Sequence, residues 1–342
     1  MSYISQQIRL ASRPQGVPQP ENFRTEEHQV REPSDGEVLL RTIYLSLDPY
    51  MRGRMSDAES YAEPVTVGEV MVGATVSEVL DSRSPDFEQG QIVRGYGGWQ
   101  SHSTEPAASL RALDPDSAPI TTALGVLGMP GFTAYAGLLA LGRPEPGETL
   151  AVAAATGPVG SAVGQIAKLK GCRTIGIAGG ADKVAHLRDL GFDVALDHRA
   201  DDLGSRLRDA TPDGIDIYFE NVGGAVFDAV LPRLNTFARV PVCGLAATYN
   251  STELPEGPDR SPALMGLILR KSLTLRGFIQ NEFVPTMFES FLRDMGAWVR
   301  AGDVRYREDI TEGLERAPEV FTGMLGGGNF GKTLIKVSDL QR

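Results

Sequence analysis

The chain has 342 residues, of which 42% are hydrophobic and 23% are charged, and its formal net charge is −11. At roughly 100–200 residues per domain this length fits two domains, and the composition is that of an ordinary globular protein. The negative charge, which no basic run offsets, argues against a nucleic-acid partner. The N-terminus lacks the apolar segment of a signal peptide, and no stretch reaches the roughly 18 apolar residues of a membrane span, so we expect a cytoplasmic protein without membrane contact.

Residues that commonly bind metal ions are few. The two cysteines, Cys172 and Cys243, cannot form a disulfide framework or a four-cysteine zinc site. Both lie in apolar, strand-like surroundings, which favour a packing role. The histidines are scattered without the spacing of metal ligands: His28, His102, His186 and His198. We therefore expect no metal site.

The N-terminal third predicts short strands rather than helices. Alternating runs such as Glu37–Tyr44, together with glycine-bounded runs in Gly68–Leu80, are typical of strands. We expect a β-rich domain shaped as a small distorted barrel. Between two of its strands, Leu45–Met55 carries Tyr50 and two arginines without any core periodicity, and we expect it to be a loop.

The middle of the chain has a different pattern. After a boundary near Gly125, an apolar helix is expected to end at Gly142, and strand-length apolar runs then alternate with helical segments. The expected strands are Leu150–Ala154, Thr174–Ala178, Val194–Asp197, Ile215–Phe219, Arg239–Cys243 and Leu273–Phe278. Such an inventory is that of a complete doubly wound parallel sheet.

The tail returns to short strands after about Val304. This return predicts that the β-rich domain is discontinuous and is formed from both ends of the chain. We expect it to comprise residues 1–123 and 304–342, with a dinucleotide-binding domain at 124–303.

The first strand–helix–strand unit of the middle region indicates a phosphate ligand. Its turn, Thr156–Gly160, leaves the first N–H groups of the following helix without intrahelical partners, and the helix dipole adds positive potential there. A pyrophosphate fits such a turn. The match to the G-x-G-x-x-G pattern is imperfect because Ala155 stands at the first glycine, so a glycine turn without a ligand remains the alternative.

The end of the second strand of that unit favours NADP over NAD. A NAD-binding unit would usually place an Asp or Glu there, whereas this chain has Gly179-Gly180-Ala181-Asp182-Lys183. The two glycines leave room for an extra phosphate, which Lys183 can neutralise. From this stretch alone, an ordinary solvated lysine is an equally good explanation. Ligands bind at the carboxyl ends of such strands, so Asn221, Gly244 and the residues around Phe278 should face the cofactor.

Six motifs, which span nearly the whole chain, together resemble one known family. They are LSLDPYMRGRM, GVLGMPGFTAY, AAATGPVGSAVGQIAKLKGC, DGIDIYFENVGG, PVCGLAATYN and GNFGKTLIKV. In this order they resemble the zinc-independent, NADP-dependent branch of the medium-chain dehydrogenase/reductases. That branch includes the prostaglandin reductases, the plant alkenal double-bond reductases and, with particular likeness, the bacterial NADPH-dependent curcumin reductases. The resemblance implies a doubly wound parallel (Rossmann) domain plus a β-rich, barrel-like (GroES-like) catalytic domain.

The resemblance also implies which residues bind NADP(H). The turn would hold the pyrophosphate and Lys183 the 2′-phosphate, while His198 falls near the adenosine end, where prostaglandin reductases have a tyrosine. A surface histidine is the alternative for His198, and a turn residue is the alternative for Asn329. The full set of expected cofactor-binding residues is Met129, Thr133, Gly157, Pro158, Val159, Gly160, Lys183, His198, Asn221, Cys243, Gly244, Tyr249, Phe278, Ile279 and Asn329.

The chemistry implied is NADPH-dependent reduction of the carbon–carbon double bond of α,β-unsaturated carbonyl compounds, such as curcumin-like enones and alkenals. Tyr249, in the family's C-G-x-x-x-x-Y-N motif, is the expected catalytic residue. A phenol with a pKa near 10 is protonated at neutral pH and can donate a hydrogen bond to the enolate oxygen. The alternative is that Tyr249 only packs on the nicotinamide ribose while water protonates the product. Tyr50 is expected to line the substrate pocket.

Two other functions stay open on the sequence. One is a quinone reductase on the same scaffold, and the other is a non-catalytic NADPH-binding protein. The resemblance further implies a homodimer. It also implies catalysis without zinc, because the early loop reads LSLDPYMR where zinc-dependent relatives carry a catalytic cysteine.

Overall fold

The computed structural model describes residues 3–253 and 257–340. The chain divides into two units, one formed by residues 1–125 and 308–342 and the other by residues 126–307. The domain boundaries predicted from the sequence are at residues 123/124 and 303/304, and this division of the chain is at 125/126 and 307/308.

The second unit is built on a parallel sheet. Among the described residues it has six strands in the order β10-β9-β8-β11-β12-β13. The strands are β8 (Thr149–Ala153), β9 (Arg173–Ala178), β10 (Val194–Asp197), β11 (Ile215–Phe219), β12 (Leu234–Val242) and β13 (Thr274–Gly277). This order is that of a doubly wound nucleotide-binding sheet, so the predicted fold class of this unit is confirmed.

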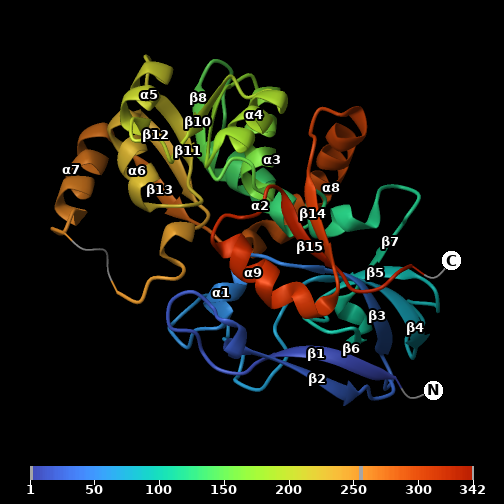
Figure 1. The fold of residues 1–342 in the computed structure, drawn as a ribbon. Helices are drawn as coiled ribbons and strands as arrows, with labels where there is room; N and C mark the ends of the chain where they lie inside the picture. The colour runs from blue at the N-terminus through green and yellow to red at the C-terminus, as the bar shows by residue number, and fades with distance from the viewer. Residues whose placement is uncertain (1–2, 254–256, 341–342) are drawn as a thin grey trace. The chain divides into compact units, whose positions relative to one another are not determined.

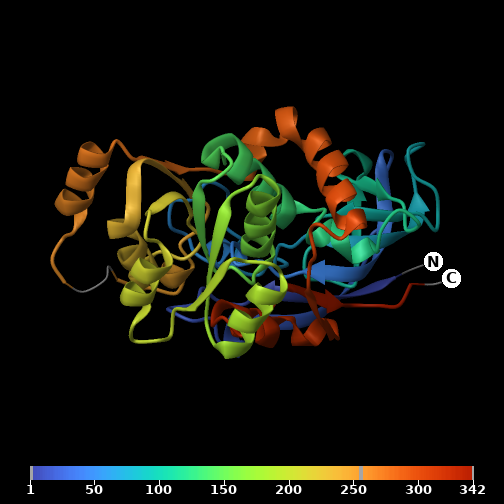
Figure 2. The same ribbon diagram turned by 90° about the horizontal axis from the view of Figure 1, so that it is seen from above.

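Helices cover both faces of this sheet (Figures 1 and 2). One face is covered by α2 (Met129–Ala136), the π-helical η4 (Gly137–Gly142), α3 (Pro158–Leu169), α4 (Ala181–Asp189) and α8 (Val284–Ala301). The other is covered by α5 (Leu203–Ala210), α6 (Gly224–Val230) and α7 (Ser261–Lys271). Within the described part of the chain, none of the helices combines the length and apolar character that crossing a bilayer requires.

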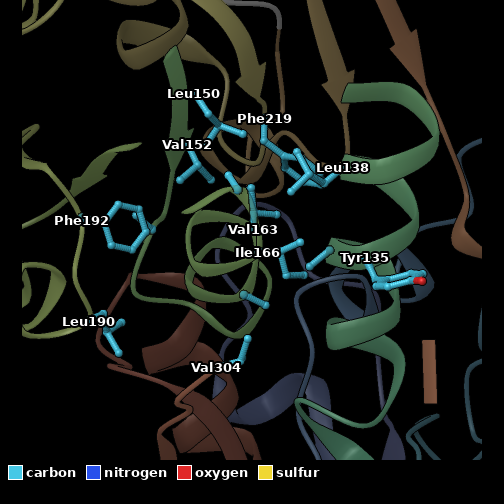
Figure 3. Packing of buried hydrophobic residues seen from close by; sticks show 14 of the residues in the cluster. Tyr135, Leu138, Leu150, Val152, Val163, Ile166, Leu190, Phe192, Phe219 and Val304 are labelled. Atoms are coloured by element: carbon cyan, nitrogen blue, oxygen red, sulfur yellow. The ribbon is translucent and has the colours of Figure 1, made fainter. Parts of the chain in front are cut away.

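Helix α3 lies at the centre of its layer (Figure 3). Its Val163 and Ile166 pack in one fully buried cluster with Leu150 and Val152 of β8 and with Leu138 of η4. Leu150 and Val152 alternate along β8 with residues that face the opposite helical layer, as expected for a strand covered on both sides. This packing fixes α3 relative to β8, and so it fixes the turn between them.

The first unit is built on a mainly antiparallel sheet, with strand order β14-β15-β3-β4-β5-β7 and with β6 also paired to β3. Its strands are β3 (Glu37–Ser46), β4 (Thr75–Ser82), β5 (Ile92–Gly95), β6 (His102–Pro106), β7 (Arg111–Leu113), β14 (Glu308–Glu312) and β15 (Lys332–Lys336). A separate hairpin joins β1 (Ile4–Leu10) to β2 (Phe23–Gln29), and α9 (Ala317–Leu325) precedes β15. Because β15 pairs with β3, both ends of the chain contribute to one sheet.

Two sequence expectations about local structure were wrong. Leu45–Met55 is not a plain loop, because Met51–Arg54 form the short helix α1, and Met51 and Met55 are fully buried. Arg52 is also buried, and its Nη2 donates to the carbonyl oxygen of Gly16 (2.9 Å). A helix of one turn is too short to show helical periodicity in the sequence.

Strand β12 begins at Leu234 rather than at Arg239. The pairing of β12 with β11 shifts register between Ile215 and Ile217, and Phe237 adopts a left-handed conformation (φ 67°). Such an irregularity interrupts the alternation of side chains by which a strand is recognised in a sequence.

A buried ion pair joins β15 to the segment after β3. Lys332 and Asp48 are only 2% and 4% exposed. The Lys332 Nζ donates to Asp48 Oδ1 (3.0 Å) and to the carbonyl oxygens of Leu47 (2.7 Å) and Thr333 (3.1 Å). Burial lowers the pKa of Lys332, and the charge of Asp48 opposes this shift. An ammonium group has three N–H donors, so these contacts compensate for much of its desolvation.

We predict that Lys332→Met lowers the free energy of unfolding by about 3–5 kcal/mol, because it leaves the Asp48 carboxylate buried without its counter-charge. Urea denaturation followed by circular dichroism measures this loss. Lys336→Met is the matched control, since Lys336 lies on the same strand but pairs with Glu312 and Asp339 at the surface. Equal losses in the two variants would contradict a special role for the buried pair.

Candidate functional site

The loops that leave the carboxyl ends of β8 to β13 lie at one edge of the sheet, because the strands are parallel. Most of the residues that the sequence predicted for the site are on these loops or on the first helical turn after them. In sequence order these residues are Gly157–Gly160, Lys183, His198, Asn221, Cys243, Gly244, Tyr249, Phe278 and Ile279.

The turn between β8 and α3 brings the helix very close to the strand. A Cβ on Gly160 would lie 2.4 Å from the carbonyl oxygen of Ala154 and 2.8 Å from the Cα of Ala155. Ala154 itself has a left-handed backbone (φ 49°), a conformation that costs about 1 kcal/mol or more for a residue with a Cβ. Gly160 therefore performs the packing role of the third glycine in a dinucleotide-binding turn.

The N-terminus of α3 is suited to an anion. Gly157 is the N-cap, Pro158 occupies the first helical position, and no side chain caps this end. Proline fits at that position because its missing N–H would have no intrahelical partner. The remaining N–H groups of the first turn and the helix dipole favour negative charge there.

A group of basic side chains surrounds the glycines that follow β9. A Cβ on Gly179 would lie 2.7 Å from His198 Nε2 and 2.8 Å from Arg199 Nε, and one on Gly180 would lie 3.6 Å from Arg199 Nη1. Lys183 lies in the first turn of α4, directly after these glycines. Arg199 was not among the residues predicted for the site, although its position just after a strand end and next to His198 indicates it.

Asp197 fixes the geometry of this basic group. Its Oδ1 accepts hydrogen bonds from the backbone N–H groups of Gly180 and Arg199, each at 2.9 Å, and these bonds lower the pKa of Asp197. Partial burial lowers the pKa of His198, and the charges of Arg199 and Lys183 add to the effect, whereas Asp197 opposes it. Lys183, His198 and Arg199 thus act on one location beside two glycines, which is suited to a phosphate group.

Some predicted residues have side chains that are engaged elsewhere. The ring of Phe278 is buried and packs edge-on against Phe219, with centroids 6.1 Å apart, so only its backbone remains for a ligand. Thr133 is buried, and its hydroxyl donates to the carbonyl oxygen of Met129 (2.8 Å). Burial, with the nearby charge of Glu220, raises the pKa of the Cys243 thiol to about 12, which excludes a thiolate nucleophile at neutral pH.

Asn221 and Tyr249 lie on neighbouring loops. Asn221 Nδ2 donates to the carbonyl oxygen of Ala153 (2.9 Å), next to the turn between β8 and α3. Tyr249 follows the short helix η6 (Ala246–Thr248), and its hydroxyl lies 2.7 Å from the position that a Cβ on Gly244 would occupy. The absence of a side chain at Gly244 therefore gives the phenol its place at the carboxyl edge of β12.

Two predicted residues, Tyr50 and Asn329, belong to the first unit. Burial, followed by the charge of Asp48, raises the pKa of the Tyr50 phenol, which keeps it protonated. The guanidinium of Arg54 lies 5.7 Å from the centre of the Tyr50 ring. Asn329 Nδ2 donates to the carbonyl oxygen of Gly331 (2.9 Å), which is the local bond expected of a turn residue. Among the residues that the structure describes, no group of three or more His, Cys, Asp or Glu side chains is arranged to hold a metal ion.

Comparison with known proteins places this chain among dehydrogenases. Residues 6–113 match the family described as the N-terminal domain of oxidoreductase, and residues 158–296 match the family described as zinc-binding dehydrogenase. The chain is 59% identical to the NADPH-dependent curcumin reductase of Escherichia coli (strain K12) over 330 residues, which cover 96% of each chain. It is 43% identical to prostaglandin reductase 1 of Rattus norvegicus, over 94% of this chain and 96% of the rat protein.

A similar chain has been solved with a cofactor. The crystal structure of CurA from Vibrio vulnificus in complex with NADPH is 52% identical in sequence to this chain. The two superpose with a TM-score of 0.95, over 98% of this chain and 99% of CurA. Likeness at this level extends over both units of the present chain.

We predict that Gly160→Ala destabilises the protein by about 1–3 kcal/mol, because the added methyl group overlaps the backbone of Ala154 and Ala155. Thermal unfolding measures the change. Gly157→Ala is the control, since its Cβ would approach no atom closer than 3.3 Å. Equal stability of the Gly160→Ala variant and the parent protein would show that α3 is not held against β8 as the structure has it.

Proposed function

Because the chain belongs to the medium-chain dehydrogenase/reductase family, in the branch that holds the curcumin and prostaglandin reductases, we propose that it is an NADPH-dependent enone reductase. Its substrates are α,β-unsaturated carbonyl compounds, and the bond reduced is the carbon–carbon double bond. The observation that carries this proposal is the 59% identity to an NADPH-dependent curcumin reductase over 96% of the chain.

The residues at the carboxyl edge of the sheet fit NADP(H). The turn Gly157–Gly160 offers backbone N–H groups at the N-terminus of α3, and Gly160 has no Cβ where the helix comes closest to β8. Such a turn suits a pyrophosphate. The absence of a side chain at Gly179 lets His198 and Arg199 lie close to the backbone there, and with Lys183 they supply the positive charge that suits the 2′-phosphate of NADP. When bound, NADPH supplies a hydride for the β-carbon of the substrate.

Tyr249 is the residue proposed to stabilise the negative charge that develops on the carbonyl oxygen of the substrate. A hydrogen-bond donor held in place before the reaction is the most effective contribution a protein can make to such a charge. The support is its position at the carboxyl edge, where Gly244 leaves room for its hydroxyl. The competing role, packing on the nicotinamide ribose, predicts a different kinetic effect of removing that hydroxyl. Tyr50 is proposed to line the substrate pocket, with its phenol kept protonated by burial and by Asp48.

Catalysis is proposed to proceed without zinc. A conjugated enone is already electrophilic at its β-carbon, so no Lewis acid is needed. The early segment that carries a cysteine in zinc-dependent relatives here carries Asp48 and Tyr50, and Asp48 is committed to a buried ion pair with Lys332.

We further propose that the protein acts in the cytoplasm and forms a homodimer, and the family resemblance implies the dimer. Size-exclusion chromatography with light scattering measures the mass in solution. A mass near the 36.7 kDa of one chain would contradict the dimer.

The proposed activity is tested by following NADPH absorbance with conjugated enones, including curcumin, and with a quinone as a control. Oxidation with enones, and a product saturated only at the double bond, is the expected result. Turnover of the quinone alone would instead support a quinone reductase. NADPH binding without oxidation by any of these compounds would support a non-catalytic protein.

Lys183→Ala and Arg199→Ala are predicted to raise the apparent KM for NADPH by about 10-fold or more while leaving that for NADH nearly unchanged. The physical reason is that each removes a charged hydrogen bond to a phosphate that only NADPH carries. Steady-state kinetics with both cofactors measures the difference. Lys170→Ala, at the opposite end of α3, is the control. Equal effects on the two cofactors would rule out a 2′-phosphate site at this location.

Tyr249→Phe is predicted to lower kcat on the order of 100-fold with little change in NADPH affinity, because it removes a donor that acts on the developing enolate. The measurement is kcat with a saturating enone, together with NADPH binding by fluorescence. Tyr306→Phe, at a partly exposed tyrosine of the same unit, is the control. An unchanged kcat would assign Tyr249 to packing on the ribose.

A further inference from the structure

The loop after β11 contains a buried carboxyl group to which the proposed reaction gives no part. Glu220 is 2% exposed. Its Oε1 accepts hydrogen bonds from the backbone N–H groups of Val222 (2.6 Å) and Gly223 (2.8 Å) and from the hydroxyl of Tyr218 (3.2 Å). Its Oε2 is buried and has no hydrogen-bond partner among the described residues.

Burying a carboxyl oxygen without a hydrogen-bond partner costs folding free energy, so the group is expected to stabilise the structure in another way. Burial raises the pKa of the Glu220 carboxyl, and the hydrogen bonds to Oε1 only partly offset that shift. What Glu220 provides is order in the loop that follows. Gly223 and Gly224 both have left-handed backbones (φ 75° and 56°), and glycines have little conformational preference of their own. The carboxyl group selects one conformation by binding two successive N–H groups.

The loop ordered by Glu220 in turn holds the next loop of the sheet edge. The carbonyl oxygen of Asn221 accepts from the N–H of Ala246 (3.2 Å), and that of Val222 accepts from the N–H of Ala247 (2.9 Å). These contacts fix the helix η6, which directly precedes Tyr249. The place of the Tyr249 backbone in the structure therefore depends on the conformation of Asn221 and Val222.

The hydroxyl end of Tyr249 depends on the same residue. Gly244, over which this hydroxyl lies, donates its N–H to the carbonyl oxygen of Glu220 (3.2 Å). The neighbouring Cys243 N–H donates to that oxygen as well (2.9 Å). Both ends of the segment that carries the phenol are thus tied to Glu220 and the two residues after it.

We propose that Glu220 is a positioning residue, whose carboxyl group orders the loop Asn221–Gly224 and, through it, places the hydroxyl of Tyr249 for donation to the substrate. The last step rests on the proposed function. The structural coupling between Glu220 and the segment 243–249 does not, and it is tested separately.

The structural coupling is tested by hydrogen–deuterium exchange without cofactor or substrate. In Glu220→Ala, the backbone amides of residues 243–249 are expected to exchange at least about 10-fold faster than in the parent protein, because Ala246 and Ala247 lose fixed acceptors. Asp216→Ala is the matched control. Asp216 lies near the start of β11, the strand that Glu220 follows, and its carboxylate also accepts from a backbone N–H, that of Thr149 (2.9 Å). Unchanged exchange at 243–249 in Glu220→Ala, or equal acceleration in Asp216→Ala, would overturn the proposal.

Glu220→Gln keeps the test decisive if Glu220→Ala does not fold. The amide oxygen of glutamine can accept the same two N–H bonds, so exchange at 243–249 is expected to stay close to that of the parent protein. Exchange in Glu220→Gln as fast as in a folded Glu220→Ala, or as fast as in a peptide of this segment, would contradict ordering by hydrogen-bond acceptance.

The catalytic consequence is tested by a double-mutant cycle with Tyr249→Phe. Glu220→Ala is expected to lower kcat with an enone about 10- to 100-fold through misplacement of the donor, with a much smaller effect on the KM for NADPH. Glu220→Gln is expected to restore most of kcat. In the Tyr249→Phe background Glu220→Ala should have little further effect, whereas additive losses would show that Glu220 does not act through Tyr249. Failure of the parent protein to reduce any enone would refute the proposed function, and the exchange experiment would still decide the coupling.

Discussion

The close contact between α3 and β8 is the constraint on which the rest of the second unit depends. The helix can approach the strand only because Gly160 has no Cβ and because Ala154 accepts a left-handed backbone. Val163 and Ile166 then fill the space between β8 and η4, and this packing holds the helix in that position. The free N–H groups at the N-terminus of α3 are consequently presented at a fixed place on the edge of the sheet.

The loops at that edge are held together by hydrogen bonds that run from one strand to the next. Asp197 ties the end of β10 to the glycines after β9, and Asn221 ties the loop after β11 to Ala153 at the end of β8. Glu220 ties the loop after β11 to the loop after β12. A site made from separate loops thereby gains the rigidity that recognition of a charged cofactor and positioning of a donor require.

The positive charge suited to an anionic ligand is local in this protein, because the chain as a whole is negatively charged. The net charge of −11 is unfavourable for an anionic ligand. His198 and Arg199 nevertheless lie together beside Gly179, the charge of Lys183 also acts on His198, and the helix dipole of α3 adds positive potential at another place on the sheet edge. Each unit also contains a buried charged or titratable group that orders backbone, namely Lys332 with Asp48 in the first unit and Glu220 in the second. Leu47, whose carbonyl oxygen Lys332 binds, is close in sequence to Tyr50, and Val222 and Gly223, whose N–H groups Glu220 binds, directly follow Asn221.

The sequence by itself determined the parallel sheet and the location of the glycine turn between β8 and α3. Strands such as β10 and β11 have the predicted bounds, because each is a short apolar run bordered by glycine or by polar turn residues. The order of such elements, β-α-β, permits few topologies, so the carboxyl edge and most of its residues follow from local pattern alone. Gly160 could be recognised because its packing role depends on a fixed spacing from a strand, and Lys183 was proposed for the 2′-phosphate from its spacing in the same way.

Only the tertiary structure decided which side chains from distant segments meet. The pairing of Lys332 with Asp48, the approach of Arg199 to Gly179, and the place of the Tyr249 hydroxyl over Gly244 depend on neighbours that the sequence does not mark. Phe278 was predicted at the site from its position at a strand end, but its ring is in the core because Gly137 leaves space for it there. The helix α1 has a single turn, and the register shift in β12 lies between Leu234 and Arg239, so neither segment shows a regular repeat of apolar residues in the sequence.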